Sequence, residues 1–328
     1  METFAFARPN DLAGVLAAIA RPGAVAIAGG TELLNWMKEG IVVPERVVDI
    51  NGLPGLDGIE AGPTGLRIGA LARMSDVARH EAVRRDYPAI SEALVKSASP
   101  QLRNMASIGG NLLQRTRCPY FRAEVDLPCN KRRPGSGCAA LEGEDRSLAI
   151  FGWSNSCIAT HPSDVAVAFA ALDASVEVVG PGGSRTIPLT EFHRLPGDAP
   201  EHETILESGE LIVAIVVPVS PLARRSHYLK VRERASYEFA LVSVAVAVDL
   251  EGDRIAAAQI AVGGVAAKPW RLAGAEEKLR GLALEAGALR AAIEDSFADA
   301  RPRKHNGFKI ELAKRTVVRA LQTAGGVA

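Results

Sequence analysis

Ala24-Val25-Ala26-Ile27-Ala28-Gly29-Gly30-Thr31-Glu32-Leu33 is the stretch that decides how this chain begins to fold. Its first five residues form a short apolar run, which predicts a buried strand. Gly29-Gly30-Thr31-Glu32 predicts a turn, which leads into a helical stretch from Leu33 to Lys38. Glycine lets a backbone approach a ligand closely and turn its N–H groups outward. Several such groups around one point form a concave anion site that suits a pyrophosphate, and a helix N-terminus adds positive charge.

A second tight glycine turn is expected at Met105-Ala106-Ser107-Ile108-Gly109-Gly110-Asn111. A single Gly-Gly pair is most often only a turn, but two similar turns with polar neighbours favour a shared ligand. Thr31, Ser107 and Asn111 offer the additional hydrogen bonds. Neither turn contains the Gly-x-Gly-x-x-Gly pattern, so the sequence does not support a nicotinamide site of the Rossmann type.

The composition is that of an ordinary globular protein. Of its residues, 48% are hydrophobic and 23% are charged. Its length of 328 residues is enough for two domains with a sizeable core. Basic and acidic residues number 38 each, which argues against nucleic acid or an anionic membrane as a partner. No apolar run approaches the roughly 20 residues that span a bilayer, and residues 1–10 do not resemble a secretory signal. We expect no membrane insertion and a cytoplasmic location, or a periplasmic one if a signal-bearing partner exports the chain.

The order of the expected elements predicts an α+β protein of two domains. The first domain covers residues 1–222, with subdomains at about 1–55 and 56–222. An irregular insertion at about 115–158 interrupts it and is too long for an ordinary loop. The second domain covers residues 223–328.

Within these domains, the apolar periodicity predicts the main helices and strands. A helix broken at Pro88 is expected over residues 75–96, and Ser163 is expected to cap another helix. In the second domain, strands at 241–250 and 255–262 precede several helices. Lys304-His305-Asn306 opens the last of these, and we expect a solvated helix cap there.

All four cysteines lie in the irregular insertion: Cys118, Cys129, Cys138 and Cys157 are separated by ten, eight and eighteen residues. Two disulfides would suit a small secreted domain better than a chain with a large core. Structural zinc usually takes paired Cys-x-x-Cys knuckles, which are missing here. An iron–sulfur cluster needs four thiolates and tolerates irregular spacing in one long loop. Basic residues that would offset its negative charge lie in the same segment: Arg115, Arg117, Arg122, Lys131, Arg132 and Arg133.

Several motifs together resemble the FAD-binding medium subunits of the xanthine dehydrogenase and carbon monoxide dehydrogenase family, the molybdenum hydroxylases. They are Ala28-Gly29-Gly30-Thr31-Glu32-Leu33, Ala106-Ser107-Ile108-Gly109-Gly110-Asn111-Leu112, His161-Pro162-Ser163-Asp164 and Lys230-Val231-Arg232-Glu233-Arg234. Gly263-Gly264-Val265-Ala266, followed by Pro269 and Arg271, also fits. The resemblance covers nearly the whole chain. It implies a two-subdomain FAD-binding domain of the PCMH-like type followed by a C-terminal α+β domain.

The resemblance also implies roles for individual residues. The FAD pyrophosphate and ribityl chain would be wrapped by Ala26, Ile27, Ala28, Gly29, Gly30, Thr31, Glu32 and Leu33, with a second wall from Ser107, Gly109, Gly110 and Asn111. Asp164 would bond the adenosine side, Lys230 would lie near the isoalloxazine, and Ile212 would touch the flavin. His161 would line the cofactor pocket or serve the entry of a helix. Several relatives place a flavin-stacking aromatic just before the second turn, whereas Ser97 to Gln101 contains none.

The cysteine segment is similar to that of a subset of the family, which includes bacterial periplasmic aldehyde oxidoreductases. In that subset Cys118, Cys129, Cys138 and Cys157 would hold a [4Fe–4S] cluster that relays electrons or stiffens the loop. The implied partners are a large subunit with the molybdenum cofactor and a small subunit with [2Fe–2S] clusters. Two other functions remain open at this point: a self-sufficient flavin oxidase of the vanillyl-alcohol type, and a zinc-stabilised binding module without redox activity.

Overall fold

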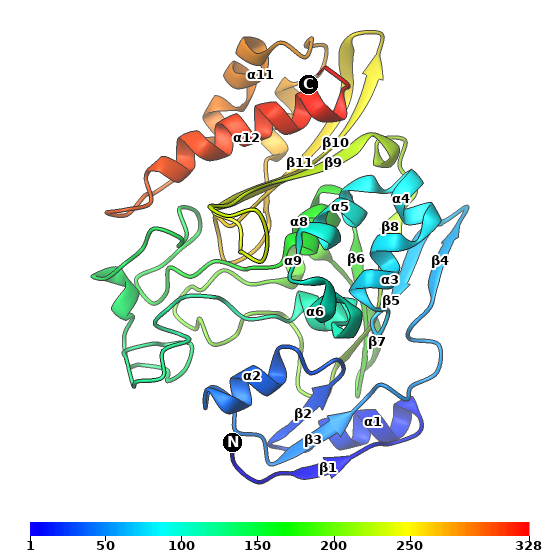
Figure 1. Ribbon diagram of the computed structural model, residues 1–328, viewed down its shortest axis with the longest axis vertical. Helices are drawn as coiled ribbons and strands as arrows, with labels where there is room; N and C mark the ends of the chain where they lie inside the picture. Colours follow the sequence, from blue (N-terminus) through cyan, green and yellow to red (C-terminus); the bar gives the residue numbers. More distant parts are fainter. Residues whose placement is uncertain (328) are drawn as a thin grey trace.

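Three β-sheets organise the chain, which a computed structural model describes for residues 1–327. The first sheet is parallel and lies at the N-terminal end of the molecule, at the bottom of Figure 1. Its strands run in the order β1-β3-β2 (Ala5–Ala7, Arg46–Asp49, Ala24–Ile27) and are accompanied by α1 (Leu12–Ile19) and α2 (Leu33–Lys38). The predicted strand at Ala24 and the predicted helix from Leu33 to Lys38 therefore both form.

The second sheet is antiparallel and occupies the middle of the molecule. Its strands run in the order β4-β5-β8-β6-β7, with bounds Ile59–Gly62, Gly65–Gly69, Leu211–Pro218, Ser175–Gly180 and Gly183–Pro188. The helical stretch expected over residues 75–96 is divided at His80 as well as before Pro88. Its three pieces are α3 (Met74–Arg79), α4 (Glu81–Asp86) and α5 (Pro88–Lys96). Helices α6 (Pro100–Met105) and α9 (Leu189–Phe192) complete this layer.

The expectation of a simple glycine turn at Ser107–Asn111 is wrong. Residues Ile108–Leu112 form the short helix α7, and the Ser107 side chain caps it by accepting a hydrogen bond from the Gly110 N–H. A serine at the N-cap satisfies an N–H group that the helix itself leaves free. Gly109 and Gly110 are therefore helical residues, and this stretch presents the beginning of a helix rather than a bend.

Helix α8 (Asp164–Ala171) lies at the centre of the molecule, and all of its residues are buried. The sequence correctly predicted its N-cap, because the Ser163 hydroxyl accepts a hydrogen bond from the Ala166 N–H at 3.1 Å. The helix packs against the middle layer on one side and against the C-terminal sheet on the other. Asp164, its first residue, is consequently held inside the protein.

The third sheet is antiparallel and carries the C-terminal helices. Its order is β12-β11-β10-β9, with bounds Trp270–Arg271, Arg254–Gly263, Val242–Glu251 and Ser226–Val231. Along β10 the valines pack with α12 (Phe308–Ala324), whereas Ala245 and Ala247 on the opposite face join the core around α8. Alternation along a strand separates these two faces, and the small alanines allow α8 to approach closely. Helices α10 (Ala273–Lys278) and α11 (Ala286–Ile293) complete the layer. The predicted α+β class is confirmed.

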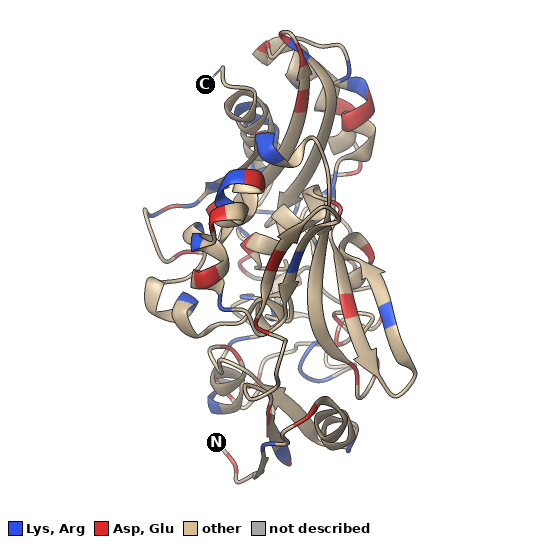
Figure 2. Cartoon of the chain, turned by 90° about the vertical axis from the view of Figure 1, so that its right-hand side faces the viewer, with Lys and Arg blue, Asp and Glu red and all other residues tan. Residues whose placement is uncertain are grey.

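Charged side chains of both signs are interspersed over the elements visible in Figure 2. This distribution agrees with the equal numbers of acidic and basic residues in the sequence. Within residues 1–327, no helix combines the length and the apolar character needed to cross a membrane.

Candidate cofactor sites

One cavity of about 420 Å³ collects most of the predicted FAD residues. Its size falls within the range of about 300–1,000 Å³ that is usual for small-molecule sites. It lies where the end of β2, the start of α7, the start of α8 and the end of β9 meet. The predicted residues that line it are Ala26, Ile27, Ala28, Gly29, Gly30, Thr31, Glu32, Leu33, Ser107, Gly110, Asn111, Asp164 and Lys230.

Three predicted residues do not line this cavity. Gly109 packs against the end of β5, where an added Cβ would lie 3.0 Å from the Ala70 Cβ. Ile212 is buried within β8 as part of the core. His161 lines a neighbouring cavity of about 250 Å³ that shares Asp164 with the first.

Gly29 explains how the two glycine segments, residues 29–32 and residues 107–111, come together. A Cβ at this position would lie 1.9 Å from the Met105 carbonyl oxygen, so only glycine allows the backbone before α7 to pack here. Gly30 has a positive φ of 71°, which turns the chain toward α2. The first glycine of the pair therefore joins the two walls of the cavity, and the second directs the chain along one of them.

Gly110 has a different role, because it leaves space on the cavity side. An added Cβ would meet only the Ser107 Oγ within 4 Å, at 2.9 Å. The neighbouring Asn111 is oriented by the Ser163 hydroxyl, which donates to its Oδ1 at 2.5 Å. The backbone at Gly110 is thus open to a ligand, and the polar groups beside it are fixed. This arrangement fits the close approach of a phosphate group.

Asp164 and Lys230 form a buried ion pair at the edge of the cavity. Their N···O distance is 2.8 Å, and the side chains are only 6% and 1% exposed. The carboxylate also accepts hydrogen bonds from the Ser97 hydroxyl at 2.8 Å and from the Tyr228 hydroxyl. Burial, reinforced by the charge of Asp164, raises the pKa of Tyr228 well above its usual value. The Asp164–Lys230 ion pair is therefore held in a fixed position at the edge of the cavity, where a ligand can contact it.

Several lining residues were not predicted from the sequence as FAD contacts. Trp36, Arg117, Tyr237 and Phe239 all line the cavity. The Arg117 guanidinium lies 4.7 Å from the Phe239 ring centroid and bonds Glu32, while its own Nε is buried without a partner. The sequence assigned Arg117 only to charge compensation in the cysteine segment. Trp36 lies in α2, just beyond the predicted segment, whereas Arg117, Tyr237 and Phe239 reach the cavity from loops that are distant in sequence, so no local pattern marks them.

Two neighbouring histidines, His193, which is buried, and His161, which is half-buried, lie near the cavity region. The rings of His161 and His193 are 4.1 Å apart. The His193 Nε2 lies 2.9 Å from the Leu112 carbonyl oxygen, and because a carbonyl only accepts, Nε2 must donate. Burial lowers the pKa of His193 to about 4 and that of His161 well below its usual value. Both rings are therefore neutral near pH 7.

The four cysteines surround a third cavity, which is much smaller than the other two, and all four are free thiols. The backbones of Cys129 and Cys138 face each other in an isolated antiparallel bridge, and Cys118 and Cys157 lie near the two ends of the insertion in the sequence. The Ala159 N–H donates to the Cys157 Sγ at 3.4 Å. The four predicted ligands are thus brought together around one cavity.

Most of the basic residues of the insertion are engaged with acceptors of the protein itself. Arg117 and Arg122 both pair with Glu32, and Arg115 and Lys131 both pair with Glu203. Lys131 also lies close enough to influence Cys157 electrostatically. The sequence predicts that these side chains offset the negative charge of a cluster. That expectation is incomplete, because their ion pairs with Glu32 and Glu203 also attach the insertion to the rest of the molecule.

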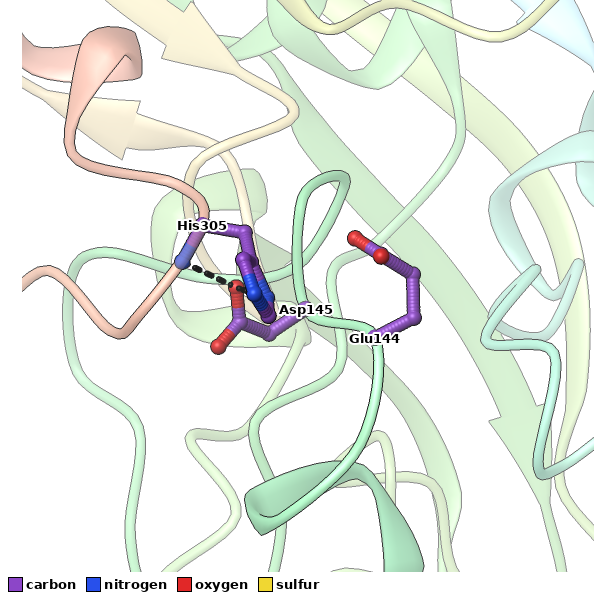
Figure 3. Close-up of side chains that lie close together, drawn as sticks. All are labelled: Glu144, Asp145 and His305. Atoms are coloured by element: carbon purple, nitrogen blue, oxygen red, sulfur yellow. Dashed lines mark hydrogen bonds and ion pairs between the residues drawn. The ribbon is translucent and has the colours of Figure 1, made fainter.

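A third group of titratable side chains connects the insertion to the C-terminal helices. Figure 3 shows Glu144, Asp145 and His305, whose potential ligand atoms lie within 4.8 Å of one another. The Asp145 carboxylate accepts hydrogen bonds from the backbone N–H groups of Lys304 at 3.1 Å and His305 at 2.8 Å. Both oxygens of the Asp145 carboxylate thus accept hydrogen bonds from backbone N–H groups, as the side chain of a capping residue does.

Two further buried residues strengthen this connection. Asn306 is fully buried and donates to the carbonyls of Leu148 and Ala149. Lys309 is also fully buried and donates to the carbonyls of Ser147, Leu148 and Gly264. The solvated cap expected at Lys304-His305-Asn306 is therefore wrong at Asn306, because long-range bonds to the insertion bury it.

Comparison with known proteins places these features in a family. Residues 2–220 match the FAD binding domain in molybdopterin dehydrogenase, and residues 227–324 match the CO dehydrogenase flavoprotein C-terminal domain. The chain is 52% identical to the aldehyde oxidoreductase FAD-binding subunit PaoB of Escherichia coli K12, over 99% of both chains. It is 27% identical to the carbon monoxide dehydrogenase medium chain of Hydrogenophaga pseudoflava, over 98% of this chain and 96% of the relative.

Solved structures share the fold. Reconstituted CO dehydrogenase from Oligotropha carboxidovorans superposes with a TM-score of 0.78 at 24% identity, covering 100% of this chain and 99% of that one. Quinoline 2-oxidoreductase from Pseudomonas putida 86 superposes with a TM-score of 0.77 at 22% identity, covering 99% of this chain and 98% of that one. With the two family matches along nearly the whole sequence, the chain belongs to the FAD-binding medium subunits of the molybdenum hydroxylases, a family of oxidoreductases.

Proposed function

We propose that this chain is the FAD-carrying electron-transfer subunit of a molybdenum-dependent aldehyde oxidoreductase, and that its four cysteines hold a [4Fe–4S] cluster. The observation that carries the proposal is the single cavity in which both glycine segments meet the buried Lys230–Asp164 pair. The substrate class comes from the 52% identical relative, an aldehyde oxidoreductase subunit.

The pyrophosphate belongs at the glycine segments. The space beside Gly110 suits the close approach of a diphosphate, and Thr31 and Asn111 supply polar contacts. Lys230 lies near the isoalloxazine. The family resemblance implies that Asp164 bonds the adenosine side. Because Asp164 is in direct contact with Lys230, we instead assign the carboxylate to the same end as Lys230, where it orients the ammonium group. FAD, when bound, exchanges electrons between one-electron and two-electron carriers.

The cysteine segment favours an iron–sulfur cluster over zinc. All four thiols line one small cavity, as the ligands of a single cluster must, and their spacing in the sequence lacks the paired Cys-x-x-Cys knuckles of structural zinc. The neighbouring N–H donor of Ala159 also suits a cluster-bound sulfur.

The partners follow from the family. A large subunit with the molybdenum cofactor would hydroxylate the aldehyde, and a small subunit with [2Fe–2S] clusters would pass electrons to this chain. The external acceptor then takes them from the flavin. The cluster in the cysteine segment relays electrons or stiffens the insertion.

Cofactor analysis of the purified full-length chain tests the proposal. We expect bound FAD and about four irons per chain, the content of one cubane cluster, with Cys129→Ser losing iron while keeping most of its FAD. Val125→Ser is a matched control, because Val125 is an exposed residue of the same segment, and it should keep both. Unchanged iron in Cys129→Ser would show that the ligand assignment is wrong. Zinc without flavin bands would instead indicate the binding module.

An activity assay without partners separates the remaining alternative. A medium subunit should not turn over aromatic alcohols or aldehydes alone, because its cavity is assigned to the cofactor. Turnover by the isolated chain would identify a self-sufficient flavin oxidase.

A further inference from the structure

We propose that Tyr237 covers the flavin ring at the mouth of the 420 Å³ cavity, in place of an aromatic residue before α7. The inference rests on the proposed binding of FAD in that cavity. It concerns the segment Glu233–Ala240 between β9 and β10, which begins three residues after Lys230.

The exposure of Tyr237 is the first observation. Its side chain lines the cavity, yet the residue is 57% exposed. Aromatic residues contribute most when their large apolar surface is covered, and they are enriched where a partner group packs against them. A planar ring system in the cavity would cover the surface that Tyr237 now exposes. The isoalloxazine is the large planar group of FAD.

The backbone of this segment holds Tyr237 in an uncommon conformation. Its φ is 54°, in the left-handed region that bulky residues rarely adopt. Arg234 supports the conformation, because its guanidinium donates to the carbonyls of Ser236 and Tyr237, each at 2.9 Å. The Glu238 carboxylate in turn accepts from the Arg234 N–H at 2.7 Å. Such conformations persist where surrounding contacts enforce them, and they cluster at ligand sites.

The neighbouring aromatic, Phe239, has a different position. It lines both the large cavity and the 250 Å³ cavity, and so forms part of the wall between them. The Arg117 guanidinium lies 4.7 Å from its ring centroid, and Arg117 is itself paired with Glu32. Phe239 is thus fixed to the cavity wall. Tyr237 lines only the large cavity. The Arg234 guanidinium lies 5.8 Å from its ring centroid, farther than Arg117 lies from Phe239, and the 57% exposure of Tyr237 leaves ring surface open to a ligand.

The location along the cavity agrees with a flavin contact. Lys230 and Asp164 mark the end to which the isoalloxazine is assigned, and the segment that carries Tyr237 follows directly from the strand of Lys230. Residues Ser97 to Gln101 provide no aromatic side chain. An offset stack of the phenol ring on the isoalloxazine would limit which acceptors reach that face of the flavin.

The test compares Tyr237→Leu with Tyr237→Phe in the full-length chain. Removing the ring should weaken FAD binding by roughly 2- to 12-fold, the equivalent of a stacking energy of about 0.5–1.5 kcal/mol. It should also increase the quenching of flavin fluorescence by iodide, because the ring becomes open to solvent. Tyr237→Phe retains the ring and should match the wild type in both the FAD dissociation constant and the access of iodide.

Two controls keep the outcomes distinct. Phe6→Leu removes an aromatic that is 61% exposed but does not line the cavity, and it should change neither quantity. If Tyr237→Leu leaves affinity and iodide access unchanged, or if Phe239→Leu alone alters them, Tyr237 is not the cover. Absence of FAD binding by the folded wild-type chain would instead contradict the proposed function.

Discussion

Gly110 illustrates how a single residue can serve both local structure and ligand access. It lies in the first turn of α7 and lines the cavity, and its absent side chain leaves the adjoining backbone open. Ser107 caps the helix from the position that a Cβ would contact. The helix and the ligand site therefore require glycine at the same place for different reasons.

Gly110→Val should abolish FAD binding, because the branched side chain occupies the space needed by the phosphate. Loss of the Ser107 cap would lower the free energy of unfolding by only about 1 kcal/mol, so the chain should still fold. Flavin content and thermal unfolding measure the two effects. Gly287→Val is the control, since no atom lies within 4 Å of its ideal Cβ in α11. Full flavin occupancy in Gly110→Val would contradict the pyrophosphate assignment.

His193 should make stability depend on pH in a defined window. Burial holds its folded-state pKa at about 4, below the ordinary value of 6.5. Between pH 6.5 and 4 the unfolded chain therefore binds a proton that the folded chain does not, and stability falls as pH falls. The full loss is about 3 kcal/mol, taking 1.36 kcal/mol per pKa unit.

The matched variant is His193→Gln, whose side-chain amide can still donate to the Leu112 carbonyl but does not titrate. Urea unfolding at several pH values gives the comparison. Wild type should lose about 3 kcal/mol more than the variant between pH 6.5 and 4. Parallel curves for the two proteins would show that His193 does not contribute this dependence.

At the scale of elements, α8 depends on small residues of the sheet beside it. A Cβ at Gly263 in β11 would lie 2.5 Å from both the Val167 Cγ2 and the Ser243 Oγ. Gly263→Ala should therefore lower the free energy of unfolding by about 1–3 kcal/mol through overpacking. Gly274→Ala should instead be neutral or stabilising by up to about 1 kcal/mol, because its site in α10 is open and helical. Denaturant unfolding distinguishes the two; equal stabilities would contradict close packing at α8.

The helices and strands with strong apolar periodicity could be predicted, and those defined by long-range contacts could not. The sequence identified β2, β10, α8 and its Ser163 cap, because hydrophobic pattern and capping are local signals. It described α7 as a turn, because two glycines disfavour a helix when only propensity is considered. Packing of Gly109 against Ala70 and the Ser107 cap overcome that propensity.

At the scale of the whole molecule, Glu32 joins the N-terminal subdomain to the insertion. It pairs with both Arg117 and Arg122, and it is only 15% exposed. Glu32→Gln should leave two nearby guanidinium groups without their carboxylate and loosen residues 115–158. We expect faster tryptic cleavage within the insertion and weaker FAD binding. Glu60→Gln, which removes an exposed carboxylate elsewhere, is the control. Unchanged cleavage would show that other contacts suffice to hold the insertion.

The candidate site was predictable where its residues form short motifs. The glycine segments, Asp164, Lys230 and the four cysteines could each be identified in the sequence, and the structure gathers the first three groups around one cavity. Arg117, Tyr237 and Phe239 could not, because their positions depend on how the insertion and the β9–β10 segment pack against α2 and its preceding loop. The direct contact between Asp164 and Lys230, 66 residues apart, likewise depends on tertiary structure.

The bonds from Asp145, Asn306 and Lys309 have a consequence for biosynthesis. They attach residues 145–149, which precede the last cysteine, to residues 304–309 near the C-terminal end. A ribosome completes the cysteine segment long before it reaches Lys309, so the nascent insertion lacks these supports during most of translation. The cysteine segment therefore gains these contacts only once nearly the whole polypeptide has been made. Under the proposed function, insertion of a cluster into the supported segment would follow completion of the chain.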